Sequence, residues 1–127
     1  MANITVTITI TVDDTKPAQR IATIRVDREP VELNSYDGIE WRISDDSPGW
    51  TFTKDKHGQS DGITIKNHLG KFKDKKGTPG NKNHQWERLI TDGQTYRYTI
   101  SVTNETKVGI TQQNLMTLSW DPTIYNN

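Results

Sequence analysis

The sequence predicts an all-β protein that folds as an antiparallel, immunoglobulin-like β-sandwich of about seven to nine strands. Two observations lead to this prediction. Short segments with alternating apolar and polar residues recur along the 127 residues, and clusters of Asp, Gly, Pro and Ser separate them, as is typical of strands joined by turns. No segment repeats apolar residues at helical spacing over about ten residues. A small β-barrel is the alternative fold.

The first expected strand runs from Ile4 to Val12, where isoleucine or valine alternates with threonine throughout. Because successive side chains of a strand point to opposite faces, the apolar residues share one face and the threonines share the other. This pattern predicts a strand with one buried face. If the strand lies at a sheet edge, it has neither proline nor charge to block pairing, and a homodimer through this Thr-rich first strand is an expected partner.

Further segments of strand character follow at short intervals. Residues 39–43 and 96–103 alternate strictly, so each should put one face into a core. The complete set is 21–26, 31–33, 39–43, 50–53, 62–66, 96–103 and 115–120. The turns expected between them are Asp13-Asp14, Asp37-Gly38, Ser47-Pro48-Gly49, Asp61-Gly62, Thr78-Pro79-Gly80, Asp92-Gly93 and Asp121-Pro122.

Residues 1–127 are expected to form a single domain with one long irregular loop at about 67–85. Six lysines and one acid, Asp74, lie between residues 66 and 85, whereas the chain as a whole has no net charge. Clustered ammonium groups could neutralise phosphates or an acidic partner. The candidate ligand contacts are Lys71, Lys73, Lys75 and Lys76. Nucleic acid is not the expected partner, because few aromatic residues lie near the loop for base stacking.

The four tryptophans provide the main binding hypothesis, since their flat apolar faces are common in concave ligand and sugar sites. Trp41 and Trp120 are in phase with strand periodicity and are expected in the core. Trp50 directly follows a turn and Trp86 ends the basic loop, so these two are the expected exposed residues. Trp86 to Ile90 is also compatible with a short turn.

No metal or cofactor is expected. The chain has no cysteine, which excludes disulfides and thiolate ligands, and its histidines do not form the close pairs typical of structural zinc sites. His57, His68 and His84 are therefore interpreted as exposed loop residues. The aspartate pairs 13–14 and 45–46 are interpreted as turn residues, because neither belongs to a loop with spaced oxygen ligands.

The sequence contains none of the catalytic motifs that can be recognised by spacing, such as a Gly-x-Ser-x-Gly elbow, His-Glu-x-x-His or a phosphate-binding Gly-Lys-Ser/Thr loop. The protein is therefore expected not to be an enzyme. A carboxylate-based glycoside hydrolase is the enzymatic alternative, because two of the sixteen acidic residues could meet in space.

Two short elements carry a resemblance to a known family. Arg28-Glu29-Pro30-Val31-Glu32-Leu33 follows the second expected strand, and the chain ends with Leu118-Ser119-Trp120-Asp121-Pro122-Thr123-Ile124-Tyr125-Asn126. With the alternating first strand, these elements resemble the DP-EP family of small bacterial proteins of unknown function. The resemblance implies an immunoglobulin-like β-sandwich and supplies no catalytic residues. Proline restricts its own φ and the residue before it, so both dipeptides also have architectural explanations.

The expected function is a non-enzymatic binding or interaction module whose partner is a protein or a saccharide bound by loops at one end. A self-assembling structural subunit is the alternative. No basic, apolar segment typical of a secretory signal precedes the first strand, and no apolar run reaches the roughly 20 residues of a membrane span. We therefore expect a cytoplasmic protein without a membrane partner.

Overall fold

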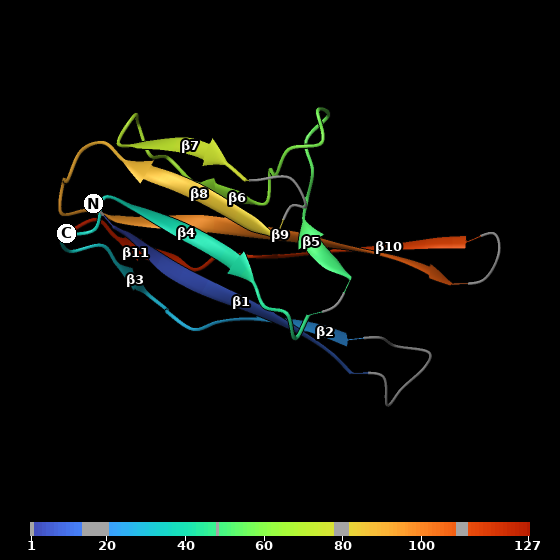
Figure 1. Cartoon of the computed structure of the whole chain (residues 1–127). Coiled ribbons are helices and arrows are strands. Elements are labelled where there is room, and N and C mark those ends of the chain that lie inside the picture. The colour runs from blue at the N-terminus through green and yellow to red at the C-terminus, as the bar shows by residue number, and fades with distance from the viewer. Residues whose placement is uncertain (1, 14–20, 48, 78–81, 109–111) are drawn as a thin grey trace.

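The computed structural model describes residues 2–13, 21–47, 49–77, 82–108 and 112–127, and of residues 12, 13, 21, 105–108 and 112–118 it describes the backbone alone. The expected all-β fold is confirmed: the described residues form eleven strands and no helix. No helix among them is long and apolar enough to cross a membrane. The strands are β1 (Asn3–Asp13), β2 (Ile21–Val26), β3 (Val31–Glu32), β4 (Gly38–Ile43), β5 (Trp50–Phe52), β6 (Ile63–Ile65), β7 (Phe72–Lys76), β8 (Asn83–Arg88), β9 (Thr95–Val108), β10 (Gln112–Trp120) and β11 (Thr123–Tyr125) (Figure 1).

The first sheet has the strand order β2-β1-β4-β8-β7. β1 pairs with β2 in antiparallel fashion, with Ile8 opposite Val26, and with β4 in parallel, with Val6 opposite Trp41. In this strand order β1 lies between β2 and β4, so it is not the terminal strand of its sheet. β4 pairs with residues 3–8 of β1 and β2 pairs with residues 8–13, so the two partners overlap only near Ile8. A homodimer through the Thr-rich strand would have to use the half of β1 that β2 does not cover.

The second sheet is organised around β9. β10 and β11 pair with β9 in one continuous register, with Trp120 opposite Ile100 and Thr123 opposite Arg97, so β11 extends the line of β10. β5 and β6 pair with β9 as well, and β3 pairs in parallel with β11. Parallel pairs thus occur in both sheets. The sheets are therefore mixed, which differs from the purely antiparallel arrangement that the sequence had suggested.

A single core joins the two sheets. The apolar residues of β1 that the structure describes, Ile4, Val6, Ile8 and Ile10, are buried, and the threonines between them are exposed or half-buried, as the alternation predicts. Trp41 on β4 lies with its ring centroid 5.1 Å from that of Tyr98 on β9, which links the two layers. The buried cluster also draws on β3, β5, β6, β7, β8 and β11. Stability therefore rests on contacts between segments far apart in sequence.

The middle of the chain differs from the expectation of one irregular loop over residues 67–85. β7 and the start of β8 lie within this range, and Trp86 belongs to β8 rather than to a turn. In β7, lysines take the place of apolar residues outside Phe72, so alternation of hydrophobicity is too weak to reveal the strand. The expected turn Thr78-Pro79-Gly80, together with Pro48 and Asp14, lies outside the described residues.

Two β-hairpins project from one end of the molecule. The strand pairs β1–β2 and β9–β10 extend past the body of the sheets at one end, whereas both chain termini lie at the opposite end (Figure 1). β2 and β10 are terminal strands in the order of their respective sheets. The space between them is consequently bordered by the outer edges of two strands.

Candidate functional site

The structure corrects the expected exposure of the tryptophans, all four of which lie in the described ranges. Trp50 and Trp86 are only 2% and 5% exposed, so both belong to the core. Trp50 faces inward with Phe52 on β5, and the indole N–H of Trp86 donates to the carbonyl of Ile63 at 2.9 Å. Trp41 is fully buried, as expected, but Trp120 is 39% exposed. The tryptophan available to a ligand is therefore Trp120.

Trp120 lies in an open groove between β2 and β10. Ala22, Thr23 and Ile24 form one wall, and Ser119 and Trp120 form the other, around a volume of about 300 Å³. Trp120 keeps its exposure because β10 is the last strand on its side of the sheet, and no further strand in the described residues covers its outer edge. Sequence periodicity places Trp120 on the inward face, but it cannot show that this face lacks a covering strand.

The chemistry of the groove is that of an apolar contact surface with polar borders. Ala22 and Ile24 pack partly against the core, and Trp120 adds an exposed aromatic face. Thr23 and Ser119 also line the groove and contribute polar groups to its border. Such a combination binds ligands by apolar contact and orients them through a few polar groups.

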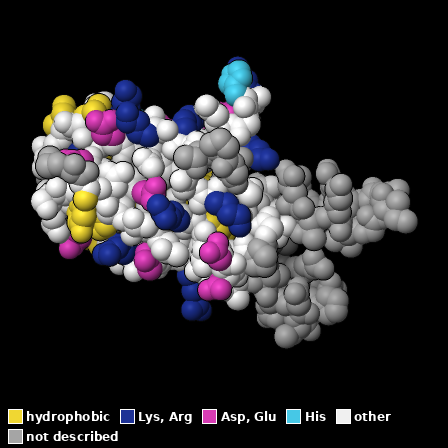
Figure 2. All heavy atoms as spheres, in the orientation of Figure 1, with side chains coloured by type: hydrophobic (Ala, Val, Ile, Leu, Met, Phe, Trp, Pro, Cys, Tyr) yellow, Lys and Arg dark blue, Asp and Glu magenta, His cyan; other side chains and the backbone are white. Residues whose placement is uncertain are grey.

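The lysines expected to contact a ligand lie on or next to β7, the edge strand of the first sheet. Lys73 and Lys75 are exposed, whereas Lys71 and Lys76 are half-buried. The ammonium group of Lys75 lies 3.3 Å from the Glu87 carboxylate. Figure 2 shows basic and acidic side chains interspersed on the face in view. The expected basic loop is thus a strand whose charge is partly balanced by neighbouring acids.

Lys76 lies among three carboxylates. Its ammonium group is 3.3 Å from Asp61, 3.6 Å from Asp74 and 3.9 Å from Asp55. Burial lowers the pKa of Lys76, but the hydrogen bond from its ammonium group to Asp61 and the neighbouring carboxylate charges outweigh this effect, and the pKa is raised. The charge of Lys76 is therefore balanced within the fold by these three carboxylates.

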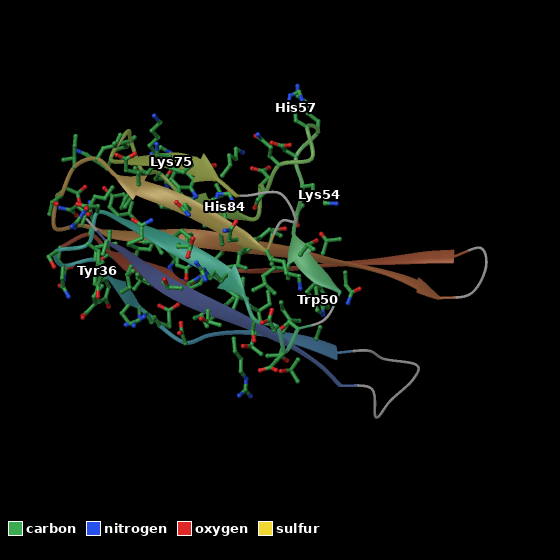
Figure 3. The ribbon with its side chains drawn as sticks, in the orientation of Figure 1. Tyr36, Trp50, Lys54, His57, Lys75 and His84 are labelled. Carbon is green, nitrogen blue, oxygen red and sulfur yellow. The ribbon has the colours of Figure 1, made fainter. Side chains whose placement is uncertain are left out.

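His84 is buried, which corrects its assignment as an exposed loop residue. Its Nδ1 lies 2.7 Å from the hydroxyl of Ser60, and its Nε2 lies 2.8 Å from Oδ1 of Asp74. His57 is exposed at the tip of the β5–β6 loop, away from the sheets (Figure 3). His68 is half-buried, with its ring 5.3 Å from that of Trp86. The sequence signal for His84 is its alternation with Trp86, which places both on one face of β8.

The charge state of Asp74 determines which atom carries the hydrogen between Asp74 and His84. Burial raises the pKa of Asp74, but hydrogen bonds from His84 and from the backbone N–H of Lys76 outweigh burial, and the pKa is lowered. An ionised carboxylate only accepts hydrogen bonds, so Nε2 of His84 carries a hydrogen and donates it to Asp74.

Ser60, His84 and Asp74 contain the residue types of a hydrolytic triad, but their geometry differs from one. In the triad, serine bonds to Nε2 and aspartate to Nδ1 of the imidazole, whereas here the two partners are exchanged. Ser60 and His84 are also 0% exposed. A nucleophile must reach its substrate, and this hydroxyl does not. The three residues therefore connect the β5–β6 loop to β7 and β8.

A second, polar cavity of about 440 Å³ lies beside the Glu29-Pro30 peptide, which is cis. Its charged groups are used within the fold. Both oxygens of the Glu29 carboxylate accept from the backbone N–H of Thr123 at 3.1 Å, and Asp27 accepts from that of Thr7 at 2.9 Å. The Glu-Pro and Asp-Pro elements are thus brought together, because Thr123 directly follows Pro122.

Within the described residues, no group of three or more histidine, aspartate or glutamate side chains is placed to hold a metal ion. Comparison with models of known protein families finds no match to this chain. Comparison with curated proteins likewise finds no significant match. The groove at Trp120 is therefore interpreted from its own geometry.

Proposed function

We propose that this protein is a non-enzymatic binding module whose ligand, a polypeptide segment, lies in the β2–β10 groove against Trp120. One observation carries the proposal: Trp120 is 39% exposed, and it forms a wall of an open groove bordered by two terminal strands. Large aromatic side chains dominate binding energy at protein interfaces. The buried positions of Ser60 and His84 support a non-enzymatic role, and the proposal retains the cytoplasmic location expected from the sequence.

A saccharide is the second candidate ligand. Thr23 and Ser119 line the same groove as Trp120, and sugars are bound by an aromatic face with hydrogen-bonding groups around it. A polypeptide is preferred because strand edges border the groove, and a strand edge offers backbone donors and acceptors in the spacing of another polypeptide chain.

The test is a titration of the protein with a panel of short extended peptides and oligosaccharides, followed by tryptophan fluorescence. Trp120→Ala should weaken binding of the active panel members at least tenfold, while the protein stays folded. The matched control is Tyr125→Ala, which removes an aromatic residue of similar exposure, 38%, from β11. Equal binding by wild type and Trp120→Ala, or equal loss in both variants, would contradict the groove as the site.

The resemblance to the DP-EP family belongs to the same proposal. Its support is the contact between the two elements that define it, where the Glu29 carboxylate accepts from the N–H of Thr123 after Asp121-Pro122. We infer that both elements are architectural, since they join β11 to the segment that leads into β3.

A further inference from the structure

We propose that the ligand binds by adding a β-strand to the outer edge of β2, and that it is an extended segment in which apolar residues alternate with acidic ones. This inference rests on the proposed function, because it names the kind of partner that the groove accepts. In strand addition, backbone hydrogen bonds supply affinity, and side-chain contacts supply specificity.

The two edges of the first sheet differ in their ability to accept a strand. At the β7 edge, Lys73 and Lys75 are exposed, and the pairing with β8 is interrupted by an irregularity between Asp74 and Lys76. Lys76 also has a φ of 58°, outside the extended region. Exposed lysines and bulges are the features by which proteins protect sheet edges from pairing. The β7 edge is thus protected.

The β2 edge has less of this protection, since it carries one exposed charge, Arg25, and no irregularity. β2 pairs with β1 in an uninterrupted register from Ile21 to Val26. No other strand in the described part of the chain pairs with its outer side. Its central residues include Thr23 and Ile24, which are β-branched and favour strands. This edge can accept a strand without rearrangement of the sheet.

The pairing pattern shows which backbone groups point outward. The N–H of Asp27 donates to the carbonyl of Thr7 at 3.1 Å, so these two residues form a hydrogen-bonded pair. Such pairs alternate along an antiparallel ladder. Residues 25 and 23 are therefore bonded to β1, and the N–H and C=O groups of Ala22, Ile24 and Val26 point to the open edge. Ala22 and Ile24 also line the groove, so an added strand would lie directly beside Trp120.

The side chains of β2 indicate which positions of an added strand should be apolar and which should be acidic. Ala22 and Ile24 face the core and the groove, so the residues of an added strand on this face should be apolar. Arg25 lies on the opposite face, is exposed, and has uncharged Thr9 as its cross-strand neighbour. No ion pair of Arg25 is found among the described residues. An acidic residue opposite Arg25 would form a favourable cross-strand pair.

The probe is a capped eight-residue peptide of alternating valine and glutamate, long enough to cover the six residues of β2. Binding should slow amide hydrogen exchange at Ala22, Ile24 and Val26 at least tenfold and leave Thr23 and Arg25 nearly unchanged. The same peptide with alternate backbone nitrogens methylated should bind at least tenfold more weakly. Arg25→Glu should reverse the preference toward a valine–lysine peptide, and Lys73→Glu, at the protected edge, should not.

The outcomes separate this inference from the proposed function. Trp120→Ala could weaken binding while N-methylation of the peptide leaves its affinity unchanged and the amides of Ala22, Ile24 and Val26 exchange as in the free protein. The groove would then bind peptides without strand addition, and only the inference would fail. If Trp120→Ala has no effect on the bound peptide, both fail. A protein that does not bind the peptide at millimolar concentration, or that protects the β2 amides by forming a dimer, would also overturn the inference.

Discussion

His84 shows how a single buried polar side chain can hold separate elements together. Its two ring nitrogens bond to Ser60, which precedes β6, and to Asp74 on β7, while His84 itself lies on β8. The three residues thereby join the β5–β6 loop to two strands of the first sheet. Buried polar groups that are fully hydrogen-bonded specify one arrangement of the core, because any other leaves a group unpaired.

We expect His84→Phe to lower the free energy of unfolding by about 2 to 4 kcal/mol, because it leaves the Ser60 hydroxyl and the Asp74 carboxylate without their partner. Urea unfolding followed by fluorescence measures the change. His57→Phe, at the exposed tip of the β5–β6 loop, serves as the control and should change the free energy by less than about 0.5 kcal/mol. A loss below about 1 kcal/mol for His84→Phe would show that the connection contributes little.

The lowered pKa of Asp74 predicts that acid reduces the free energy of unfolding. Its pKa in the folded protein lies below the ordinary value of 3.8, mainly because hydrogen bonds from His84 and Lys76 outweigh the opposing effect of burial. A group of this kind contributes stability above the unfolded pKa and loses it as the pH falls through the folded pKa. The free energy of unfolding should therefore fall as the pH drops from about 5 to below 4.

Asp74→Asn should make this decline shallower, since an asparagine cannot be protonated and still accepts a hydrogen bond from His84. Urea unfolding at several pH values between 3 and 7 provides the comparison. An identical decline in wild type and Asp74→Asn would assign the acid sensitivity to other carboxylates.

Leu69 occupies an unfavourable backbone conformation at the surface. Its φ is 52° and its side chain is 85% exposed, so it has the cost of a left-handed residue without the compensation of burial. Leu69→Asn should raise the free energy of unfolding by about 0.5 to 1 kcal/mol, because asparagine tolerates this region. Leu89→Asn, at an exposed leucine that does not have a positive φ, should not stabilise the protein. Equal effects of both variants would attribute any gain to surface polarity alone.

Alternation of apolar and polar residues was sufficient to predict the strands that have one apolar face. The segments 4–12, 39–43 and 96–103 became β1, β4 and β9 because their apolar residues repeat every second position. The sequence did not predict β7, β8 or β11. β7 is rich in lysine, β8 consists mostly of polar residues, and β11 has only three residues. Periodicity also cannot give strand order, so the inner position of β1 and the exposure of Trp120 depend on pairings between distant segments.

The lysines of β7 are expected to keep the edge of the first sheet from pairing with other molecules. Lys73→Val should increase self-association at high concentration, because it removes an exposed charge from an edge strand and adds a β-branched residue. Light scattering against protein concentration measures this effect. Lys56→Val, in the exposed β5–β6 loop, is the control and should remain at the wild-type mass. A monomeric Lys73→Val protein would mean that the β7 irregularity alone protects the edge.

The two ends of the molecule differ in structure. At the end with the termini, the Arg88 guanidinium donates to the carbonyls of Asn34 at 2.7 Å and Asn127 at 2.8 Å, so one side chain ties the last residue to the loop before β4. At the other end, the hairpins β1–β2 and β9–β10 extend outward (Figure 1). The groove with Trp120 lies between β2 and β10. The proposed partner would therefore bind at the end opposite the termini.

The central claim is that a polypeptide partner binds in the β2–β10 groove. It is tested most directly by mapping backbone and indole NMR shifts of the isotope-labelled protein during titration with the valine–glutamate peptide. If the peptide binds in the groove, the largest shifts should occur at residues 22–26, at Ser119 and at the indole N–H of Trp120. The buried indoles of Trp41 and Trp50 should be nearly unaffected. Shifts concentrated on β7 or the β5–β6 loop, or no shifts at saturating peptide, would contradict it.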